Sequence, residues 1–387
     1  MLSGLEVLMP TVFANSRSIV HKGDGQVNTA APPDVCKTPS PGGPVPIPYV
    51  NVAKTSDLAK GTKKVKIEGN AAGNAGSNLS ISTGDEAGTA GGGIISSKTK
   101  GKMTWATKSA TVLLEGKGAV RFMDVDQHNG NSFNTVFTQM GGTGMAYADD
   151  FQGQCEICRN GPADHRAIET ASSAQLCRDI IQALTDAYNN AASNNQRKKI
   201  GNNGGGYMVG VMSCKHDPSL TFAARSGRSN QQFESIAGPF VTKVIGGGTV
   251  EPDEFIRANT SGVARSRVSQ KMLAACQTVE REANNRTPGF NPLGSCAGSK
   301  LLARSGHAPV EMTEMFFKPP GTGTWDATYS VITNRNDQVA PAWLRSVLDN
   351  AMSRREDVPY STGMPVASCR SCQTTLYLTM CPERVCT

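Results

Sequence analysis

The cysteine and histidine residues of this sequence have the types and spacing best suited to metal binding or nucleophilic catalysis. The chain has 387 residues, among them eleven cysteines, and several of these lie close together. Cys155 and Cys158 form one C-x-x-C pair, and Cys369 and Cys372 form a second. The N-terminal residues have no basic segment followed by a long apolar run, so we expect no Sec-type signal peptide. An odd number of cysteines in such a chain favours metal sites over a disulfide framework, which stays the alternative.

Three cysteines are expected at the N-termini of two helices. Cys296 lies in the segment Gly-Ser-Cys-Ala-Gly-Ser-Lys-Leu-Leu, residues 294–302, and begins one of them. Cys369 and Cys372 lie in the first turn of the other. The positive end of a helix dipole stabilises a thiolate. Three thiolates can hold zinc and leave a fourth position open for water, which is the arrangement of a catalytic zinc site.

A second set of zinc ligands is predicted near the middle of the chain. It consists of Cys155, Cys158, His165 and Cys177, which follow one another closely. Two thiolates on a tight turn, followed by a ligand near the start of a helix, are typical of small zinc knuckles. We expect this zinc to be structural and to stabilise a segment too small to form a core of its own. Free thiols in a linker are the alternative.

Two Cys–His arrangements would give thiol chemistry instead. Cys296 at a helix N-terminus could act as a nucleophile with His307 as its base, which would make the protein a thiol hydrolase. That interpretation leaves the second C-x-x-C pair without a role. Cys214 and His216, in a predicted hairpin turn, form another conceivable pair.

The first third of the chain is predicted to be an all-β unit. Residues 13–130 are rich in Gly, Ser, Thr, Val and Lys and contain short alternating segments at 64–67, 78–82 and 110–114. Each segment is bounded by Gly, Asn or Pro, as short strands joined by tight turns usually are. Helical spacing begins only later, within residues 168–192.

A domain boundary is expected in the polar, glycine-ending stretch 194–206. The multidomain chain is therefore divided into an all-β N-terminal domain, 1–135, a linker that holds the middle cysteines, 136–200, and an α/β C-terminal domain, 201–387.

The C-terminal domain is expected to position the catalytic cysteines. Its predicted elements are a hairpin at 207–212 and 220–224, helices at 264–282 and 295–304, a strand at 311–317, and helices at 343–352 and 369–381, the last with Ser368 as its N-cap. Cys381 and Cys386 lie at and beyond the end of the final helix. They could pair with each other or remain reduced, and the sequence leaves both open.

The N-terminal domain resembles the PAAR-like domains of type VI secretion systems. The resemblance spans residues 13–129 and is carried by a run with five prolines at 35–49 and by the segments 84–93 and 115–122. A proline-rich run stays extended and cannot join a central strand. The resemblance implies a small β cone whose base caps the trimeric VgrG spike and whose tip pierces a target cell.

The same resemblance implies a metal ion at the tip, held by histidine and cysteine. His21, Cys36 and His128 are the candidate ligands in this sequence. Imidazole and thiolate are zinc ligands. The alternative places the two histidines in loops and the cysteine in the core.

The C-terminal domain resembles the cytidine-deaminase-like superfamily, in particular its bacterial toxin branches. The resemblance spans residues 205–381 and is carried by Cys296, by the C-x-x-C pair that begins the last helix, and by Phe-Ala-Ala-Arg-Ser-Gly at 222–227. It implies that Cys296, Cys369 and Cys372 bind zinc. It also implies a zinc-activated water that attacks the ring carbon carrying the amine of cytosine or adenine.

The sequence departs from that family at one catalytic position. The family's motif has a glutamate two residues after the first zinc ligand, and Gly298 stands there in this chain. Glu311 and Glu314, on the next predicted strand, are the candidates for the missing proton carrier. Three residues apart, they point to opposite faces of a regular strand, so at most one should face the site. A surface charge at a strand end is the alternative.

The sequence as a whole predicts a type VI secretion effector that carries an antibacterial toxin. The resemblances imply synthesis in a bacterial cytoplasm, delivery into a target cell, VgrG and a cognate immunity protein as partners, and a nucleic acid or nucleotide as substrate. The formal net charge of +7 permits a nucleic-acid substrate. No run of about 18 apolar residues occurs, so we expect no membrane insertion. A spike tip that only punctures is the non-enzymatic alternative.

Overall fold

The structure is a computed structural model, and contacts divide its chain into two compact units. It describes residues 10–14, 17–30, 33–109, 112–132, 134–137, 144–149, 151, 153–258, 265–287, 290–322, 325–328, 357–360, 362–363, 365–366, 368–381 and 386. The described residues up to Gly144 form the first unit, and those from Met145 onward form the second.

The described part of the first unit is built from short strands and turns, which confirms the prediction of a β-rich domain. The strands are β1 Phe13–Ala14, β2 Arg17–Ser18, β3 Val27–Thr29, β4 Asp34–Thr38, β5 Val45–Tyr49, β6 Val52–Lys54, β7 Leu58–Ala59, β8 Lys66–Ile67, β9 Asn70–Ala71, β10 Asn78–Leu79, β11 Gly92–Gly93, β12 Thr104–Trp105, β13 Leu113–Leu114, β14 Lys117–Gly118, β15 Val125–Gln127 and β16 Thr135–Phe137. Small apolar clusters hold them together, one of which contains Ala53, Leu58, Leu79 and Met103.

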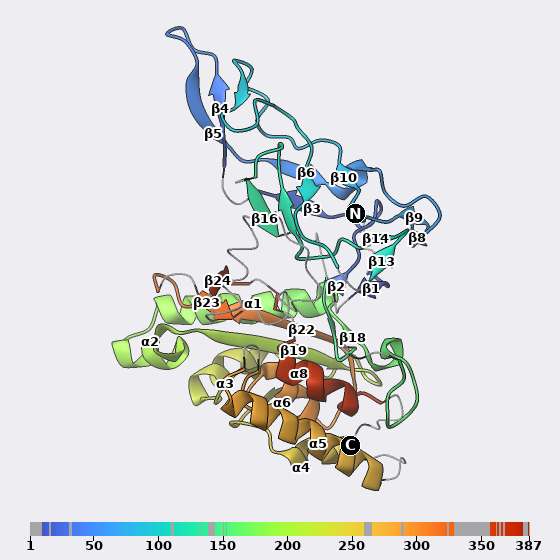
Figure 1. The fold of residues 1–387 in the computed structure, drawn as a ribbon. Helices are drawn as coiled ribbons and strands as arrows, with labels where there is room; N and C mark the ends of the chain where they lie inside the picture. The colour runs from blue at the N-terminus through green and yellow to red at the C-terminus, as the bar shows by residue number, and fades with distance from the viewer. Residues whose placement is uncertain are drawn as a thin grey trace. The chain divides into compact units, whose positions relative to one another are not determined.

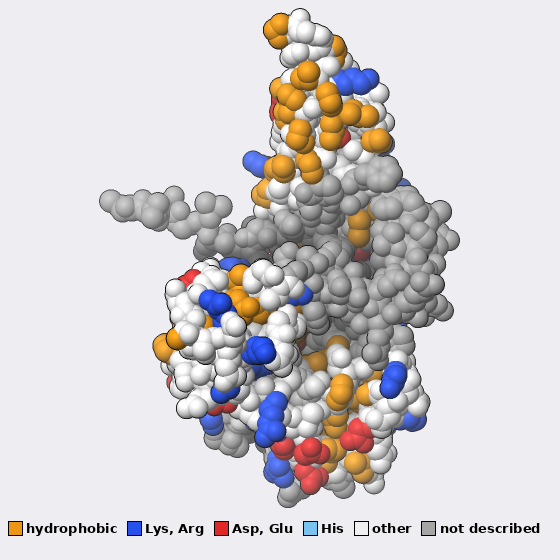
Figure 2. Space-filling model, turned by 90° about the vertical axis from the view of Figure 1, so that its left-hand side faces the viewer, with side chains coloured by type: hydrophobic (Ala, Val, Ile, Leu, Met, Phe, Trp, Pro, Cys, Tyr) orange, Lys and Arg blue, Asp and Glu red, His pale blue; other side chains and the backbone are white. Residues whose placement is uncertain are grey.

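The proline-rich run forms the edge of a sheet. Among the described strands, its strand β5 pairs only with β4, in a three-stranded sheet of order β11-β4-β5. Figure 1 shows β4 and β5 as a long hairpin at one end of the unit. Pro46 and Pro48 lack the N–H that a further neighbouring strand would need. Figure 2 shows hydrophobic side chains gathered on this unit. The large exposed ones at and after the hairpin are Val45, Ile47, Val50, Ile94 and Ile95.

The second unit is organised by a mixed sheet, which the described strands form in the order β17-β18-β22-β19-β20-β21. Its strands are β17 Ala146–Tyr147, β18 Ala167–Ile168, β19 Tyr207–Cys214, β20 Thr221–Arg225, β21 Lys243–Ile245 and β22 Pro309–Phe317. The central strand β19 is antiparallel to both β20 and β22, which confirms the predicted hairpin. A separate antiparallel pair is formed by β23 Trp325–Thr328 and β24 Asp357–Tyr360.

Helices cover both faces of this sheet (Figure 1). They are α1 Ala171–Asn189, α2 Asn194–Ile200, α3 Gln231–Ala237, α4 Pro252–Ala258, α5 Arg265–Asn284, α6 Ala297–Arg304 and α8 Arg370–Thr375. Helix α1 packs in a core with Val209, Val211 and Met315. The alternate residue Gly210 faces α6, because a Cβ placed there would lie 2.8 Å from that of Ala297. Since side chains alternate along a strand, α1 and α6 lie on opposite faces.

The expected linker belongs to the second unit. Residues 194–200 form α2, whose N-cap Ser193 accepts a hydrogen bond from the Gln196 N–H and whose last residue, Ile200, is buried in the core below α1. Strands β17 and β18 and helix α1 precede it and also belong to this unit. The structure therefore divides the chain at residue 144 rather than in the stretch 194–206, because burial of Ile200 outweighs the polar composition around it.

One predicted helix differs from the expectation. The helix after Cys369 begins with that residue as its N-cap, not Ser368, and after Thr375 it continues only as a 3-10 turn, Leu376–Thr379. The helix predicted at 343–352 lies outside the described residues. In the part of the chain that the structure describes, no helix is both long and apolar enough to cross a membrane.

Candidate active site and metal centres

The structure brings together the three cysteines that the sequence assigned to a catalytic metal. Cys296 is the N-cap of α6, Cys369 is the N-cap of α8, and Cys372 lies in the first turn of α8. The Sγ atoms of Cys296 and Cys369 are 3.3 Å apart, and the three sulfur atoms all lie within 4.8 Å of one another. Two helix N-termini thus converge on one set of thiols, which we call the thiol triad.

The thiols of the triad share their protons unequally. Hydrogen bonds from Cys296 and Cys372 lower the pKa of Cys369 well below its ordinary value. The hydrogen bond to Cys369 raises the pKa of Cys296, and contacts with Cys296 and Cys369 raise that of Cys372. The three thiols therefore influence one another's protonation. A cation that binds all three would displace the remaining protons.

Glu314 is the acidic side chain beside the triad. It projects from β22 toward α6, is only 4% exposed, and its Oε1 accepts a hydrogen bond of 2.8 Å from the Gly298 N–H. Burial raises its pKa to about 7, and the charge of Cys369 adds to the effect. A Cβ at position 298 would lie 3.2 Å from Glu314 Oε2, so glycine leaves the space that the carboxylate needs.

Glu311 lies elsewhere and is not part of the candidate active site. Its Oε1 accepts a hydrogen bond of 2.6 Å from Ser213 Oγ, and its Oε2 accepts one from the hydroxyl of Thr170, the N-cap of α1. The catalytic alternative at Glu311 is therefore wrong, because the side chain secures the start of α1. Only one of the two glutamates faces the triad, as the alternation of a strand requires.

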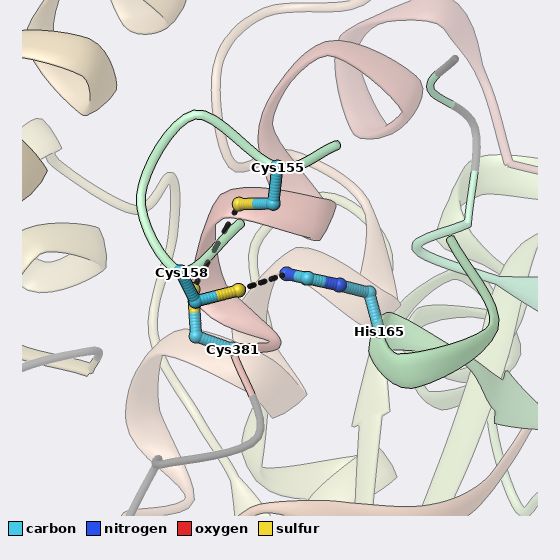
Figure 3. A group of neighbouring side chains, drawn as sticks. All are labelled: Cys155, Cys158, His165 and Cys381. Carbon is cyan, nitrogen blue, oxygen red and sulfur yellow. Dashed lines mark hydrogen bonds between the residues drawn. The ribbon is translucent and has the colours of Figure 1, made fainter. Parts of the chain in front are cut away.

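A second group of metal-ligand side chains joins the middle of the chain to its C-terminal segment. Cys155, Cys158, His165 and Cys381 offer ligand atoms within 4.8 Å of one another, and Figure 3 shows them turned toward a common centre. We call them the knuckle group. His165 Nε2 is 3.3 Å from Cys158 Sγ, while its Nδ1 is 3.1 Å from the carbonyl oxygen of Gly161. Donation from Nδ1 to that carbonyl leaves Nε2 free to bind a metal.

The pKa values of two thiols in the knuckle group are also shifted, in opposite directions. The hydrogen bond with Cys381, followed by that with His165, lowers the pKa of Cys155 to about 3. Burial raises the pKa of Cys158. The set of three sulfur atoms and one imidazole matches a closed structural zinc site.

Cys177 is not a member of this group, and the sequence-based assignment of it as a ligand is wrong. It is a residue of helix α1 and is fully buried in the core, where its Sγ lies 3.3 Å from the carbonyl oxygen of Val209. Burial raises its pKa, which suits a neutral core thiol. Cys381 takes the expected place of Cys177. No local spacing could reveal that ligand, because it is 226 positions from Cys155.

The three ligands expected at the spike tip do not meet. His21 Nε2 lies 3.4 Å from Glu68 Oε2, and His128 Nδ1 lies 2.9 Å from Ser82 Oγ. Among the described residues, neither histidine belongs to a group of three or more possible metal ligands. The expected site made of these histidines and Cys36 is therefore wrong, since each histidine has a separate polar partner.

Cys36 instead lies beside two carboxylates, Asp34 and Asp85. The oxygens of Asp34 accept hydrogen bonds of 2.6 and 2.9 Å from the amides of Asn129 and Asn131. Burial, together with the two carboxylates, raises the pKa of the Cys36 thiol to about 12. This group is a buried hydrogen-bond network that ties the start of β4 to residues 129–131.

The thiol-hydrolase alternative also fails on geometry. His307, the expected base for Cys296, lies in a separate group with Cys214 and Cys386, and its ring packs on Phe222 with centroids 5.0 Å apart. The neighbours of the Cys296 thiol are Cys369 and Cys372 instead. A nucleophile–base pair needs direct hydrogen-bond reach.

Comparison with known proteins identifies the class of the first unit. Residues 27–136 match the family model of the toxin PAAR-like domain, which confirms the resemblance inferred from the proline- and glycine-rich motifs. The matched region ends before the thiol triad and the knuckle group.

One similar protein is the DNase toxin Tse7 of Pseudomonas aeruginosa. The two are 39% identical over 128 residues, which cover 32% of this chain and 33% of Tse7. The chain thus spans about a third of the length of the curated relative that it matches. No solved structure matches the chain.

Proposed function

We propose that the protein is a type VI secretion effector whose second unit is a zinc-dependent hydrolase that deaminates a nucleobase, cytosine or adenine. The single observation that carries the enzymatic part is the convergence of the thiol triad with the buried carboxylate of Glu314. The toxin PAAR-like domain and the similarity to a protein named as a toxin support delivery into a target cell.

The thiol triad fits a catalytic zinc ion by the chemistry of its donors. Cys296, Cys369 and Cys372 supply three sulfur ligands, and no fourth protein ligand joins them among the described residues. Zinc sites with three protein ligands are the ones that keep a position for water. When bound there, zinc lowers the pKa of a water molecule and supplies a nucleophile at neutral pH.

Glu314 is the group that moves protons. Deamination of a nucleobase forms a C–O bond, breaks the C–N bond of the exocyclic amine and releases ammonia. Glu314 accepts one proton of the attacking water and delivers it to the ring nitrogen. It then takes the second proton from the hydroxyl that has been added to the ring carbon and delivers it to the departing amine, so that the hydroxyl becomes the carbonyl of the product. A pKa of about 7 suits both directions of transfer at neutral pH. The Gly298 N–H fixes one oxygen of the carboxylate during these steps.

Lys300 positions the helix that carries Cys296. It is fully buried, and its ammonium donates hydrogen bonds to the carbonyl oxygens of Arg225, at 2.8 Å, and Gly227. The Gly227 N–H in turn donates to the Ser295 carbonyl at 2.8 Å. These contacts attach α6 to the segment 222–227 at the end of β20, which carries part of the resemblance to deaminases.

The proposed partners follow from the same assignment. The exposed hydrophobic residues at and after the β4–β5 hairpin indicate a protein-binding surface on the first unit. We assign the VgrG spike to the PAAR-like domain and a cognate immunity protein to the toxin unit, with a nucleic acid or nucleotide as substrate.

Product analysis of the purified full-length chain tests the proposal. The zinc-loaded protein is incubated with single-stranded DNA, duplex DNA, RNA and free nucleotides. Mass spectrometry then follows conversion of cytosine to uracil and of adenine to hypoxanthine, and gel electrophoresis follows strand cleavage. We expect deamination, which Cys369→Ala and Glu314→Gln abolish and Glu311→Gln leaves intact.

Two other outcomes would replace the proposal. Strand cleavage without base conversion, lost in the same two variants, would assign nuclease chemistry to the triad, in keeping with the name of the Tse7 relative. A zinc-loaded chain that alters no substrate and is harmless inside a bacterium would favour the spike that only punctures.

A further inference from the structure

A third cluster of metal-ligand side chains lies in the second unit, apart from the triad and the knuckle group. Cys214 at the end of β19, His307 between α6 and β22, and Cys386 offer ligand atoms within 4.8 Å of one another. The Sγ atoms of Cys214 and Cys386 are 3.4 Å apart. The exposed side chain of His216 adds its Nδ1 at 3.0 Å from Cys386 Sγ. These four residues are called the terminal group.

Backbone hydrogen bonds hold the described segments that carry Cys214 and His307 together. The pairing of β19 with β22 shifts register between Ser213 and Cys214, at the end of the strand. The Lys215 N–H donates to the Ala308 carbonyl at 2.7 Å, which holds the hairpin turn beside the segment that carries His307. The Ala308 N–H points to Cys386 Sγ at 3.4 Å. Backbone hydrogen bonds of this kind orient a ligating sulfur.

An unsatisfied buried nitrogen points to a missing ligand at the same place. His307 Nδ1 is buried and has no hydrogen-bond partner in the described structure, although His307 is in the cluster with two thiols. A buried polar atom without a partner is costly, and a bound metal ion is one way to satisfy it.

We propose that Cys214, His216, His307 and Cys386 form a zinc site. Two thiolates and two imidazoles are a standard set for structural zinc, and four protein ligands leave no open position for catalysis. The site would attach Cys386 to the hairpin turn and to the start of β22. It also assigns Cys386 a metal-binding role that neither sequence alternative, pairing with Cys381 or remaining an unbound thiol, foresaw.

The proposal excludes a Cys214–Cys386 disulfide, its nearest competitor. A disulfide would use the two sulfurs but would leave His307 Nδ1 and His216 without a role. The inference does not depend on the proposed deaminase activity, because none of the four residues belongs to the triad or contacts Glu314 in the described structure.

Zinc content of the full-length chain tests this site. The wild type and variants are made by cell-free synthesis in zinc-containing buffer, so that toxicity does not limit yield, and desalted. The number of zinc ions per chain is measured by elemental mass spectrometry. We expect Cys214→Ser, Cys386→Ser and the double variant each to hold one zinc ion fewer than the wild type. Cys276→Ser, which changes a buried thiol outside all the groups, should keep the wild-type count.

Cobalt substitution and peptide analysis give the second measurement. The absorption spectrum of the cobalt-loaded protein should lose the contribution of the cobalt ion at the terminal group, and this loss should be the same in His307→Ala and in Cys386→Ser. Circular dichroism should show that both variants keep an intact fold. Equal zinc content in wild type and Cys386→Ser would overturn the proposal. So would a Cys214–Cys386 disulfide found in peptides alkylated without reduction. Neither the zinc content nor the peptide analysis depends on deaminase activity, so this test stays separate from the test of the proposed function.

Discussion

The N–H of Gly298 donates a hydrogen bond to Oε1 of Glu314 at a distance of 2.8 Å. The first residue lies in helix α6, two positions after Cys296, and the second comes from the neighbouring strand β22. A carboxylate therefore stands beside the thiol triad although the helix itself supplies none. The glycine contributes the hydrogen bond and, by lacking a Cβ, the room for the carboxylate.

Glu314→Gln should abolish catalysis and leave the metal in place. The amide keeps the size of the side chain and can still accept from the Gly298 N–H, but it cannot carry a proton. We expect kcat/KM to fall by about 10²- to 10⁴-fold, the usual contribution of a general acid–base group. The measurement is the rate of base conversion together with zinc content. Glu311→Gln is the matched control, and equal losses in both variants would contradict the assignment.

Activity should depend on pH through Glu314. Its carboxylate form accepts the proton, and its pKa is raised to about 7. We therefore expect kcat/KM to fall about tenfold for each unit of pH below that value. A profile of initial rates across this range checks the expectation. A rate that is constant down to the ordinary glutamate pKa of 4.5 would remove Glu314 from the mechanism.

The same raised pKa predicts a change in stability. Between pH 4.5 and about 7 the folded protein holds a proton on Glu314 that the unfolded chain releases. The free energy of unfolding contributed by this group therefore falls as the pH rises through that range. Glu314→Gln should unfold at higher urea than the wild type at about pH 8, by about 1–3 kcal/mol, and alike at about pH 4. A variant less stable at both pH values would indicate a structural role.

Gly298→Ala should separate catalysis from folding. The added Cβ would lie 3.2 Å from Oε2 and 3.4 Å from Cδ of Glu314, so the carboxylate must move by a few tenths of an ångström. Alanine favours a helix over glycine by about 1 kcal/mol. We expect unchanged or higher thermal stability and a kcat/KM lowered by about 10- to 100-fold. Wild-type kinetics in this variant would show that the spacing between α6 and Glu314 is not critical.

Cys381→Ser should remove the metal of the knuckle group, whereas Cys177→Ala should not. The Sγ of Cys381 lies in one group of possible metal ligands with Cys155, whereas Cys177 is a core thiol of helix α1. Zinc content should drop by one ion per chain only in Cys381→Ser. Cys177→Ala should lower the free energy of unfolding by about 1 kcal/mol through lost packing. The reverse pattern of zinc loss would restore Cys177 as the ligand.

Local sequence determined much of this protein. The alternation of apolar and polar residues predicted the β19–β20 hairpin. The spacing of prolines and glycines indicated the PAAR-like domain, which the family match confirms. Cys296 and Cys369 were recognisable as helix-terminal residues because the signals that begin a helix lie within a few positions. A C-x-x-C pair likewise brings two thiols together without help from the rest of the fold.

Tertiary structure alone decided which distant groups complete each site. The register of β22 against β19 turns Glu314 toward α6 and Glu311 toward α1, and a strand pattern by itself cannot say which face meets the metal. Cys381 lies beside Cys155, 226 positions away, and Cys386 lies beside Cys214, 172 positions away, while Cys177 is a buried core residue of helix α1. Contacts between residues so far apart in the sequence depend on how whole helices and strands pack, and the spacing of neighbouring residues does not predict that packing.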